Sequence, residues 1–540
     1  MDVGCSGVVL LMILAVAIAG AAKESAVNLL EAEALHKSGW WGDGSTTATN
    51  ISAHCHWSGI ICNNAGSVTE ILLPNCGIQD DLANFSFSSF PNLVHSPNSP
   101  ISIWVSPVFS SKPYQLAQLD VSWNSIDSLN PLEIGNSTNL VTLDLSYNSF
   151  GGPILPTLGQ LSNLRSLDLS NNLFSGTIPS ALFNLTNLSW LHIQCNPKIG
   201  GFLSEEIGNL KRLLELDLSY GAFSGSIPPS LGQLSNLRSL DLSTNHFSGT
   251  IPSALFNLTN LFRLNIHWNP AMRGFLSEEI GNLKSLVELD LSYGAFSGSI
   301  PPSLGQLSNL RSLDLSTNHF SGTIPSALFN LTNLFRLDIH SNPAMRGFLS
   351  EEIRNLKSLG ELDFSGLNLS GALPSALCDL TKLVSLSGAE NQIYGSIPSD
   401  IGNLKYLEYL HLGSNQLTGQ IPPTLGNLPF LQILDLSSNQ LTGPIPTQFG
   451  DNIKSKWHLS TLDLSHNILS GTVPWSLLQL GDVDLSYNAL EGELPCKLVI
   501  QFGSDRFVGN PHLRHDSTLC GASPSPSVMG NHTPSIESGS

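Results

Sequence analysis

One short phrase of amino acids recurs along almost the whole chain, at a spacing of mostly 24 residues. It reads L-x-x-L-x-L-S-x-N-x-(F/L)-S-G-x-I-P, and the stretch from Leu143 to Asn148 contains its centre. The Asn position is occupied by Asn75, Asn124, Asn148, Asn172, Asn196, Asn245, Asn269, Asn318, Asn342, Asn391, Asn415, Asn439, Asn467 and Asn488, and in phase by Gly221, Gly294 and Leu367. A fixed period of this length indicates a solenoid, in which each repeat is one coil that contacts only its neighbours.

The leucine pattern predicts the parts of each coil. Each L-x-L stretch is expected to be a short strand with its leucines pointing inward and its x residues outward, because strand side chains alternate. One repeat cannot bury its own leucines, so the coils must stack, and each buried Leu contributes roughly 1.5–3 kcal/mol. The Asn is expected to hydrogen-bond backbone groups of the adjacent coil. The predicted fold class is a β-rich α/β leucine-rich-repeat solenoid with a parallel sheet on its concave face.

The S-G-x-I-P segments, such as Ser175–Pro179 and Ser248–Pro252, resemble the marker of the plant-specific class of leucine-rich repeats. The resemblance covers about residues 67–495, with seventeen repeats. It implies a right-handed superhelical horseshoe and a second short sheet on its flank, contributed by the Ile-Pro segment.

Two steps of the pattern are irregular. The step from Asn75 to Asn124 is 49 residues long and contains one degenerate repeat around residues 93–115. The step from Asn439 to Asn467 is 28 residues long, with about four extra residues near 451–454. Each irregularity is either a bulging loop or an excursion that contacts a ligand.

The N-terminus predicts export from the cell. An apolar run from Val8 to Ala19 precedes small residues, which indicates a signal peptide over residues 1–22, although Asp2 stands where Lys or Arg is usual. No later apolar run approaches the roughly 18–20 residues that span a bilayer, so we expect no membrane span and an extracellular, apoplastic protein. Sequons for N-glycosylation occur at Asn50, Asn84, Asn136, Asn184, Asn187, Asn257, Asn330, Asn368 and Asn531. The net charge of −19 argues against a nucleic-acid partner.

The cysteines mark the two ends of the repeat array. The sequence from Cys55 to Cys62, C-x-W-x-G-I-x-C, resembles the N-terminal cap of plant extracellular repeats, which implies a cap over residues 23–66 with a Cys55–Cys62 disulfide. A metal site is the alternative, but two further ligands at matching spacing are missing. Residues 496–521 resemble the C-terminal cap, which implies a Cys496–Cys520 bridge, and residues 522–540 form a Ser/Pro-rich tail expected to be disordered. Unpaired packing cysteines are expected at Cys76, Cys195 and Cys378.

A longer period of 73 residues lies over the short one. Residues 202–274 and 275–347 are nearly identical and indicate a tandem duplication. They differ at the pairs Arg212/Ser285, Leu214/Val287, Asn265/Asp338 and Trp268/Ser341. The last two pairs fall on outward strand positions, where they reflect either drift at a tolerant surface or tuning of contacts with a partner.

The outward strand positions are the expected ligand-binding surface. Most repeats have Asp and Ser there, as in Asp144 and Ser146, so departures toward Trp, Arg and His are informative, because binding hot spots favour Trp, Tyr and Arg. The predicted ligand-binding residues are Trp190 and His192 on one strand, Arg263, His267 and Trp268 on another, and Arg336 and His340 on the equivalent strand of the next block. Further rings are expected at Tyr147, Tyr220, Tyr293, Tyr409 and His411. Ordinary surface is the alternative interpretation of each aromatic residue. The Arg-x-Arg pair with which related receptors read a peptide carboxylate is missing from these strands.

The sequence lacks the motifs of common enzymes, including the nucleophile elbow, the phosphate-binding loop, the H-E-x-x-H helix and the kinase signatures. We therefore expect no catalytic residue, no metal site and no cofactor. The chain resembles the ectodomains of plant leucine-rich-repeat receptor-like kinases and receptor-like proteins, without the membrane helix and kinase. This implies a peptide or protein ligand in signalling or defence and a possible co-receptor kinase. The alternatives are a secreted inhibitor similar to polygalacturonase-inhibiting proteins, or a truncated receptor kinase that acts as a decoy, with a plasma-membrane location if the native chain continues.

Overall fold

The computed structural model describes residues 28–36, 51–57, 59–71, 118–127, 138–450 and 459–514, together with the single residues 89 and 135. Residues 1–345 and 346–540 form two compact units, which we call unit 1 and unit 2. The predicted signal peptide, the degenerate repeat, the four extra residues, Cys76, Cys520 and the tail lie outside the described residues. Among the described residues, every helix is too short or too polar to cross a bilayer.

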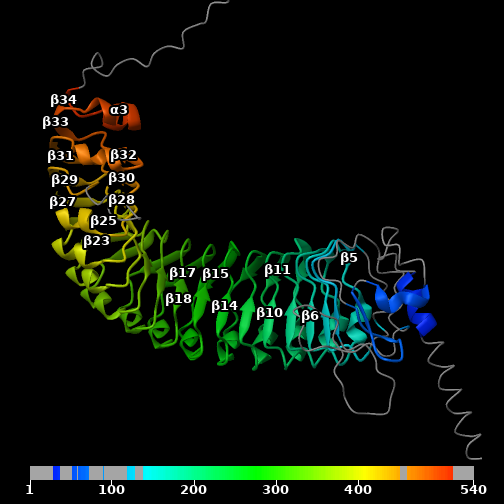
Figure 1. Cartoon of the computed structure of the whole chain (residues 1–540). Coiled ribbons are helices and arrows are strands. Elements are labelled where there is room, and N and C mark those ends of the chain that lie inside the picture. Colours follow the sequence, from blue (N-terminus) through cyan, green and yellow to red (C-terminus); the bar gives the residue numbers. More distant parts are fainter. Residues whose placement is uncertain are drawn as a thin grey trace, which may run out of the picture. The chain divides into compact units, whose positions relative to one another are not determined.

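The main sheet of unit 1 is built from the L-x-L stretches, as predicted. Its parallel strands follow one another in chain order, and Figure 1 shows β6, β10, β14 and β18 along this unit. The strands are β3 (Gln118–Asp120), β4 (Thr142–Asp144), β6 (Ser166–Asp168), β8 (Trp190–His192), β10 (Glu215–Asp217), β12 (Ser239–Asp241), β14 (Arg263–Asn265), β16 (Glu288–Asp290), β18 (Ser312–Asp314) and β20 (Arg336–Asp338). From β4 to β18, each strand buries its central residue and turns the flanking residues outward, as the alternation of a strand requires, whereas in β20 Asp338 is buried as well.

A second parallel sheet, which we call the flank sheet, accompanies the main sheet. Its strands are β5 (Gly151–Pro153), β7 (Leu173–Gly176), β9 (Lys198–Phe202), β11 (Ala222–Ser226), β13 (His246–Gly249), β15 (Ala271–Phe275), β17 (Ala295–Ser299), β19 (His319–Gly322) and, across the division between the units, β21 (Ala344–Gly347). The sheet was expected from the Ile-Pro segment, and that assignment is wrong, because the strands precede it. Ile227 is buried, and Pro228 caps the next helix, since proline has no N–H to donate to a sheet.

Short 3-10 helices close the coils of unit 1. They are η4 (Pro156–Gln160), η5 (Ser180–Asn184), η6 (Glu205–Asn209), η7 (Pro229–Gln233), η8 (Ser253–Asn257), η9 (Glu278–Asn282), η10 (Pro302–Gln306) and η11 (Ser326–Asn330). In η8, Pro252 is the N-terminal cap residue and Leu255 and Phe256 are buried. The fixed φ of proline suits this position, and the few residues between two strands leave room for only a short helix.

The core of each coil is made of the leucines of the repeat and one large apolar residue from the flank sheet, which is a phenylalanine in most coils and Ile199, Met272 or Met345 in the others. Leu237, Leu240 and Leu242 are fully buried, and Phe223 stacks on Phe247 of the next coil at 6.1 Å between ring centroids. The coils therefore bury one continuous apolar column within the unit, which is the arrangement that the repeat predicted.

From Asn148 to Asn342 in unit 1, the Asn of each repeat that has one makes the predicted bond to the neighbouring coil. The Nδ2 of Asn245 donates to the carbonyl oxygens of Leu218 at 2.8 Å, Leu242 at 3.2 Å and Ser243 at 3.0 Å, and its Oδ1 accepts from the N–H of Phe223 at 3.0 Å. At Gly221, which stands in the Asn position, a Cβ would lie 2.9 Å from the Oδ1 of Asn245. The Asn of one coil thus occupies the space that a side chain at Gly221 would need.

The N-terminal cap residues described in unit 1 confirm the Cys55–Cys62 disulfide, whose Cα atoms are 5.5 Å apart. It joins η1 (Ile51–His56) to β1 (Ile60–Cys62), which pairs antiparallel with β2 (Val68–Ile71). Residues 28–36 are helical, and the buried carboxylate of Glu31 accepts hydrogen bonds from Ser67 Oγ and Val68 N–H. Burial raises the pKa of Glu31.

Unit 2 repeats the same coil. Its main strands are β22 (Glu361–Asp363), β24 (Ser385–Ser387), β26 (Tyr409–His411), β28 (Ile433–Asp435), β30 (Thr461–Asp463) and β32 (Asp482–Asp484). Its flank strands are β23 (Asn368–Ala372), β25 (Gln392–Ser396), β27 (Gln416–Gln420), β29 (Gln440–Gly443), β31 (Ile468–Gly471), β33 (Ala489–Glu493) and β34 (His512–Arg514). Its helices are η12 (Glu351–Asn355), η13 (Ser375–Asp379), η14 (Ser399–Asn403), η15 (Pro423–Asn427), η16 (Trp475–Gln479), α3 (Cys496–Phe502) and η17 (Asp505–Phe507). Cys496 is disulfide-bonded, and Cys195 and Cys378 are free thiols, as predicted for those two.

Deletion of residues 202–274 is expected to leave a folded protein. The new junction joins Gly201 to Phe275, which repeats the native sequence Gly201–Phe202, and three whole coils are removed. Phe275 contacts Gly298 as Phe202 contacts Gly225, so the packing at the junction is preserved. Since a solenoid is stabilised by contacts between neighbouring coils, the melting temperature is expected to fall by only a few degrees, as scanning calorimetry would measure.

Deletion of residues 202–262 is the matched control, because it ends inside a coil and puts the leucines out of phase. This variant is expected to lose its cooperative transition. A molten or aggregated product from the in-phase deletion would contradict the expectation.

Candidate functional site

The outward residues of β4 to β20 form one surface, which we call the main-sheet face. The last residues of these strands lie opposite one another in register, since the strands are parallel and evenly aligned. This carboxylate row contains Asp144, Asp168, His192, Asp217, Asp241, Asn265, Asp290, Asp314 and Asp338. Adjacent strands are about 4.8 Å apart, so the row brings like charges close together.

Burial and neighbouring carboxylates shift the pKa values of residues in this row. The pKa of Asp144 is raised to about 6 by burial and, further, by the neighbouring carboxylates of Asp168 and Asp120, although hydrogen bonds from Ser146 oppose the shift. Burial also raises the pKa of Asp217 and of Asp290, and the carboxylate beside each adds to the effect. The main-sheet face therefore holds negative charge at an energetic cost.

His192 interrupts the row of carboxylates and reduces the repulsion between its neighbours. Its Nδ1 lies 3.4 Å from Asp168 and its Nε2 lies 3.6 Å from Glu215. The hydrogen bond with Asp168 raises the pKa of His192 against the opposing effect of burial, and Asp217 and Glu215 add to the rise. Burial would raise the pKa of Asp168, but hydrogen bonds from His192 and Ser170 outweigh it, and that pKa is lowered. His192 thus lies between carboxylates that favour its protonated form.

Exposed rings lie where the chain leaves five of the main strands of unit 1, at Trp123, Tyr147, Tyr220, Trp268 and Tyr293. The residue before each repeat Asn has left-handed backbone, with φ of 54° at Trp268 and 53° at Tyr293, which turns its side chain away from the core. Trp268 stacks on Tyr293 with ring centroids 4.5 Å apart, and Trp123 stacks on Tyr147 at 3.8 Å. Trp268 is 52% exposed and Tyr293 41%, so these rings are available to another molecule.

The predicted ligand-binding residues fall into three clusters on this face. Trp190 and His192 lie on β8. Arg263 begins β14, whereas His267 and Trp268 lie beyond its end at Asn265, so the prediction that all three share one strand is wrong. The strand is shorter because the backbone already turns toward the Asn position. Arg336 and His340 occupy the equivalent places of β20 and the turn that follows it. Three strand spacings separate successive clusters, which is about 14 Å.

The Ser residues after the strands were expected to face outward with the Asp residues, and this is also wrong. Ser146, Ser170 and Ser243 are buried. The N–H of Ser243 donates to Oδ1 of Asp241 at 2.9 Å and its hydroxyl donates to the same oxygen at 2.6 Å. The Ser side chain turns back under the carboxylate and supports the row, so the outward chemistry comes from Asp and from the ring positions.

The two nearly identical blocks differ in their ion pairs. In the first block, Arg263 binds Glu288 at 2.9 Å and the Nδ2 of Asn265 donates to Asp241 at 2.9 Å. In the second block, Arg336 contacts Asp338 at 2.8 Å and Asp314 at 3.3 Å.

The second block has Asp338 where the first block has Asn265. This additional carboxylate therefore binds Arg336 and holds it against the carboxylate row. Ser341 stands where the first block has Trp268, so the second block also lacks the exposed indole.

One cluster has the order of a hydroxyl–imidazole–carboxylate relay. Nε2 of His340 lies 3.4 Å from the hydroxyl of Thr317, and its Nδ1 lies 2.6 Å from Asp338. The hydroxyl contact is long for proton transfer, Thr317 is held in left-handed backbone, and Arg336 shares the same carboxylate. The geometry supports an ion-paired binding face rather than a nucleophilic site.

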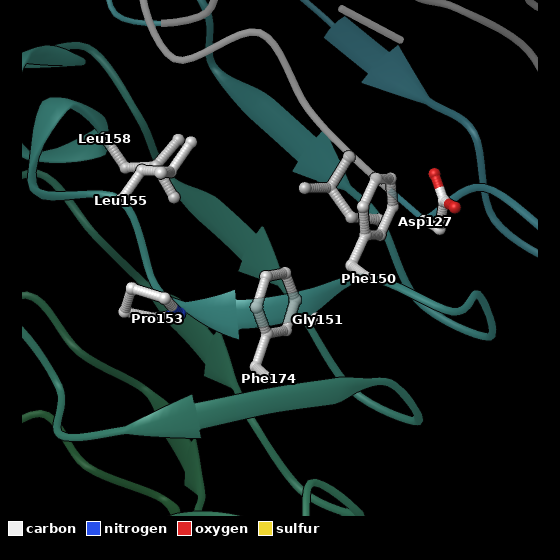
Figure 2. A pocket seen from close by; sticks show the side chains of 8 residues that line it. Asp127, Phe150, Gly151, Pro153, Leu155, Leu158 and Phe174 are labelled. Atoms are coloured by element: carbon white, nitrogen blue, oxygen red, sulfur yellow. The ribbon is translucent and has the colours of Figure 1, made fainter. Parts of the chain in front are cut away.

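A hollow of about 150 Å³ lies at the first fully described coils of unit 1. Figure 2 shows the rings of Phe150 and Phe174 beside it, with Leu155 and Leu158 on one side and Asp127 on the other. Its lining is completed by Leu145, Gly151 and Pro153. Among the described residues that line the hollow, Asp127 is the one titratable group, so these residues offer no acid–base pair.

The described sequons divide by environment. Asn184, Asn257 and Asn330 end the helices η5, η8 and η11 and are exposed, away from the main strands. The side chain of Asn187 instead donates to the carbonyl of Ser162 at 2.9 Å and accepts from Arg212. Asn368 lies exposed on β23 of unit 2. Glycosylation stays a prediction, and Asn50, Asn84, Asn136 and Asn531 lie outside the described residues.

Two residues of the face were not predicted as part of the site. Glu215 and Glu288 hold His192 and Arg263, and Tyr293, which was expected only as a further ring, stacks on Trp268. Glu215, Glu288 and Tyr293 each lie 25 residues after Trp190, Arg263 and Trp268, respectively, and this offset was a usable signal, because residues one repeat apart lie on adjacent strands.

Comparisons with known proteins agree with this geometry. Family models match residues 220–350 as a leucine-rich repeat region, residues 405–447 as two leucine-rich repeats, and residues 139–161, 163–185 and 458–480 as single repeats. No curated protein sequence matches the chain.

Solved plant receptor ectodomains are similar to the structure. The ectodomain of the Arabidopsis thaliana receptor kinase GASSHO1/SCHENGEN3, in complex with CASPARIAN STRIP INTEGRITY FACTOR 2, is 35% identical over 74% of this chain and 50% of its own, with a TM-score of 0.66. The plant peptide hormone receptor RGFR1, in complex with RGF2, is 29% identical over 85% and 82%, with a TM-score of 0.64. The Arabidopsis receptor kinase HAESA, in complex with the peptide hormone IDA and the co-receptor SERK1, is 26% identical over 90% and 98%, with a TM-score of 0.62. The chain spans about half the length of the first of these.

Proposed function

We propose that this chain, a leucine-rich-repeat protein similar to the ectodomains of plant receptor kinases, is an extracellular recognition protein that binds a peptide or protein ligand on its main-sheet face. Exposed stacked rings beside ion-paired side chains, repeated over parallel strands, are the observation that carries the proposal. Such a surface is long, flat and polar with aromatic anchors, which suits an extended chain more than a small molecule.

Three further observations support it. The similar structures of GASSHO1/SCHENGEN3, RGFR1 and HAESA were solved in complex with CASPARIAN STRIP INTEGRITY FACTOR 2, RGF2 and the peptide hormone IDA, and the last also contains the co-receptor SERK1. The Cys55–Cys62 disulfide fits an oxidising, extracellular compartment. The exposed sequons at Asn184, Asn257 and Asn330 lie away from the main strands, so glycans there would leave the main-sheet face open. A co-receptor kinase is the partner that would carry the signal into the cell.

Replacing Trp268 and Arg263 together with Ala is expected to weaken ligand binding by roughly 30- to 100-fold, since buried Trp and Arg contacts dominate protein interfaces. The ligand is first captured from plant extracellular fluid on the immobilised chain. Its affinity for the unaltered and double-variant chains is then compared by isothermal titration calorimetry.

The control is Asn257→Gln, on an exposed helix end away from the main strands, which is expected to bind as the unaltered chain does. Equal affinity of the double variant, with unchanged folding, would contradict the proposed site. Capture of a cell-wall-degrading enzyme that loses activity when bound would instead support the inhibitor alternative.

A further inference from the structure

We infer that the ligand presents a basic side chain, Arg or Lys, to the stacked pair of Trp268 and Tyr293. The inference rests on the function proposed above, because it names the chemistry of the ligand at the same face. It depends on the charge left on the face, on the exposed rings, and on the contrast between the two blocks.

The main-sheet face of unit 1 remains negative after its own ion pairs have formed. Its two arginines already contact carboxylates: Arg263 contacts Glu288, and Arg336 contacts Asp314 and Asp338. Its histidines also lie beside carboxylates: His192 beside Asp168 and Glu215, His267 beside Asp290, and His340 beside Asp338. The remaining row includes Asp144, Asp217 and Asp241, two of which have raised pKa values because of burial and neighbouring carboxylates. A cationic ligand would relieve this repulsion, and an anionic ligand would increase it.

Exposed arginines and the carboxylate row lie at opposite ends of the main strands. The exposed arginines Arg165, Arg238 and Arg311 precede β6, β12 and β18. They lie at the opposite end of each strand from the carboxylate row and the exposed rings. Glu215 and Glu288 begin β10 and β16, but they contact His192 and Arg263, so most of the carboxylates lie at the end of the strands near Trp268 and attract a basic ligand group to that end.

The rings supply the second half of a cation site. The face of an indole or phenol ring attracts an ammonium or guanidinium group within about 6 Å of its centroid. Trp268 and Tyr293 are stacked, half-exposed and held after β14 and β16. Asp241 and Asp290 end the strands on the two sides of β14, so carboxylates flank the strand that Trp268 follows. Aromatic rings and carboxylates together are the groups that bind a guanidinium or an ammonium.

The second block shows what happens without this arrangement. Arg336 is drawn onto Asp314 and Asp338, which lowers the negative charge there. Ser341 replaces Trp268, and the sequence has Gly366 one repeat after it, where the first block has Tyr293. The cation site is thus assigned to one block only, which gives the chain an internal control.

The test uses the full chain and short fluorescein-labelled peptides of Gly and Ser around two Arg residues. A second peptide has citrulline, which has the shape of arginine without its charge, at both positions. Fluorescence anisotropy is expected to show the arginine peptide binding at least tenfold more tightly than the citrulline peptide. Trp268→Ser, which installs the residue of the second block, is expected to weaken the arginine peptide about tenfold and to leave the citrulline peptide unchanged.

Ser341→Trp is the matched control, because it adds an indole without a stacking partner, and it is expected to bind as the unaltered chain does. A photoreactive arginine peptide is expected to label residues near Trp268 and Tyr293. Three results would overturn the inference: equal binding of both peptides, no effect of Trp268→Ser, or labelling elsewhere. A captured natural ligand that lacks basic residues would also overturn it while leaving the proposed function intact, whereas failure to capture any saturable ligand would reject the proposed function.

Discussion

Replacing Asn245 with Ala is expected to lower the free energy of unfolding by about 3 kcal/mol or more. The side chain is 3% exposed and serves the carbonyls of Leu218, Leu242 and Ser243 and the N–H of Phe223. Alanine would leave these buried backbone groups without that partner, at about 1–3 kcal/mol for each one that stays unsatisfied. Urea unfolding followed by circular dichroism would measure the change.

Hydrogen exchange at the Phe223 amide would locate the loss, because each coil of a solenoid depends on its neighbours. The exposed Asn257→Gln variant is the control and is expected to change stability by less than about 0.5 kcal/mol. A similarly small effect of Asn245→Ala would show that water or a rearranged backbone replaces these bonds.

Replacing Asp144 with Asn is expected to stabilise the protein above pH 6 by about 1–2 kcal/mol. The pKa of this carboxyl is about 6 in the folded protein and near 3.8 when unfolded, because burial and the adjacent carboxylates disfavour its charge. A folded pKa above the unfolded one contributes stability that is complete below the unfolded value and is lost as pH rises through the folded value. The full shift would correspond to about 3 kcal/mol, reduced here because the side chain is partly solvated.

The unaltered protein should therefore lose this contribution between about pH 4 and pH 6, and Asp144→Asn should not. Thermal unfolding of both proteins across this range would show the difference. The Asn side chain keeps an oxygen that accepts from Ser146 N–H.

Asp168→Asn is expected to have the opposite effect and serves as the matched variant one strand away. Hydrogen bonds from His192 and Ser170 lower the pKa of Asp168, so its stabilising contribution is present above the unfolded pKa and is lost as pH falls. The variant is therefore expected to be less stable than the unaltered protein at neutral pH. A shift of both variants in the same direction would contradict the electrostatic account of the row.

Much of the fold followed from the repeat. The main strands, the Asn hydrogen bonds, the buried leucines and the Cys55–Cys62 disulfide all lie where the pattern placed them. The outward residues Trp190, Arg263 and Trp268 also lie on the predicted face. These features depend on period and residue type, which are local properties of the chain.

The site followed from the sequence only in part. The pattern did not predict that Ser243 turns under Asp241, or that the flank strands precede the Ile-Pro segment. It treated Asp144 and Asp168 as the same surface residue, although their pKa values shift in opposite directions. The difference arises because His192 follows one of them on the next strand and not the other.

By itself, the sequence determined that this chain stacks coils, buries its leucines and displays the residues between them on a sheet. Only the tertiary structure decided how those displayed residues act on one another. Equivalent residues of successive coils lie about 5 Å apart in space but mostly 24 residues apart along the chain. Each carboxylate or ring therefore contacts partners from other repeats. The ion pairs of Arg263 and Arg336 and the stacking of Trp268 on Tyr293 are set by those neighbours. Two blocks with almost the same sequence therefore present different chemistry.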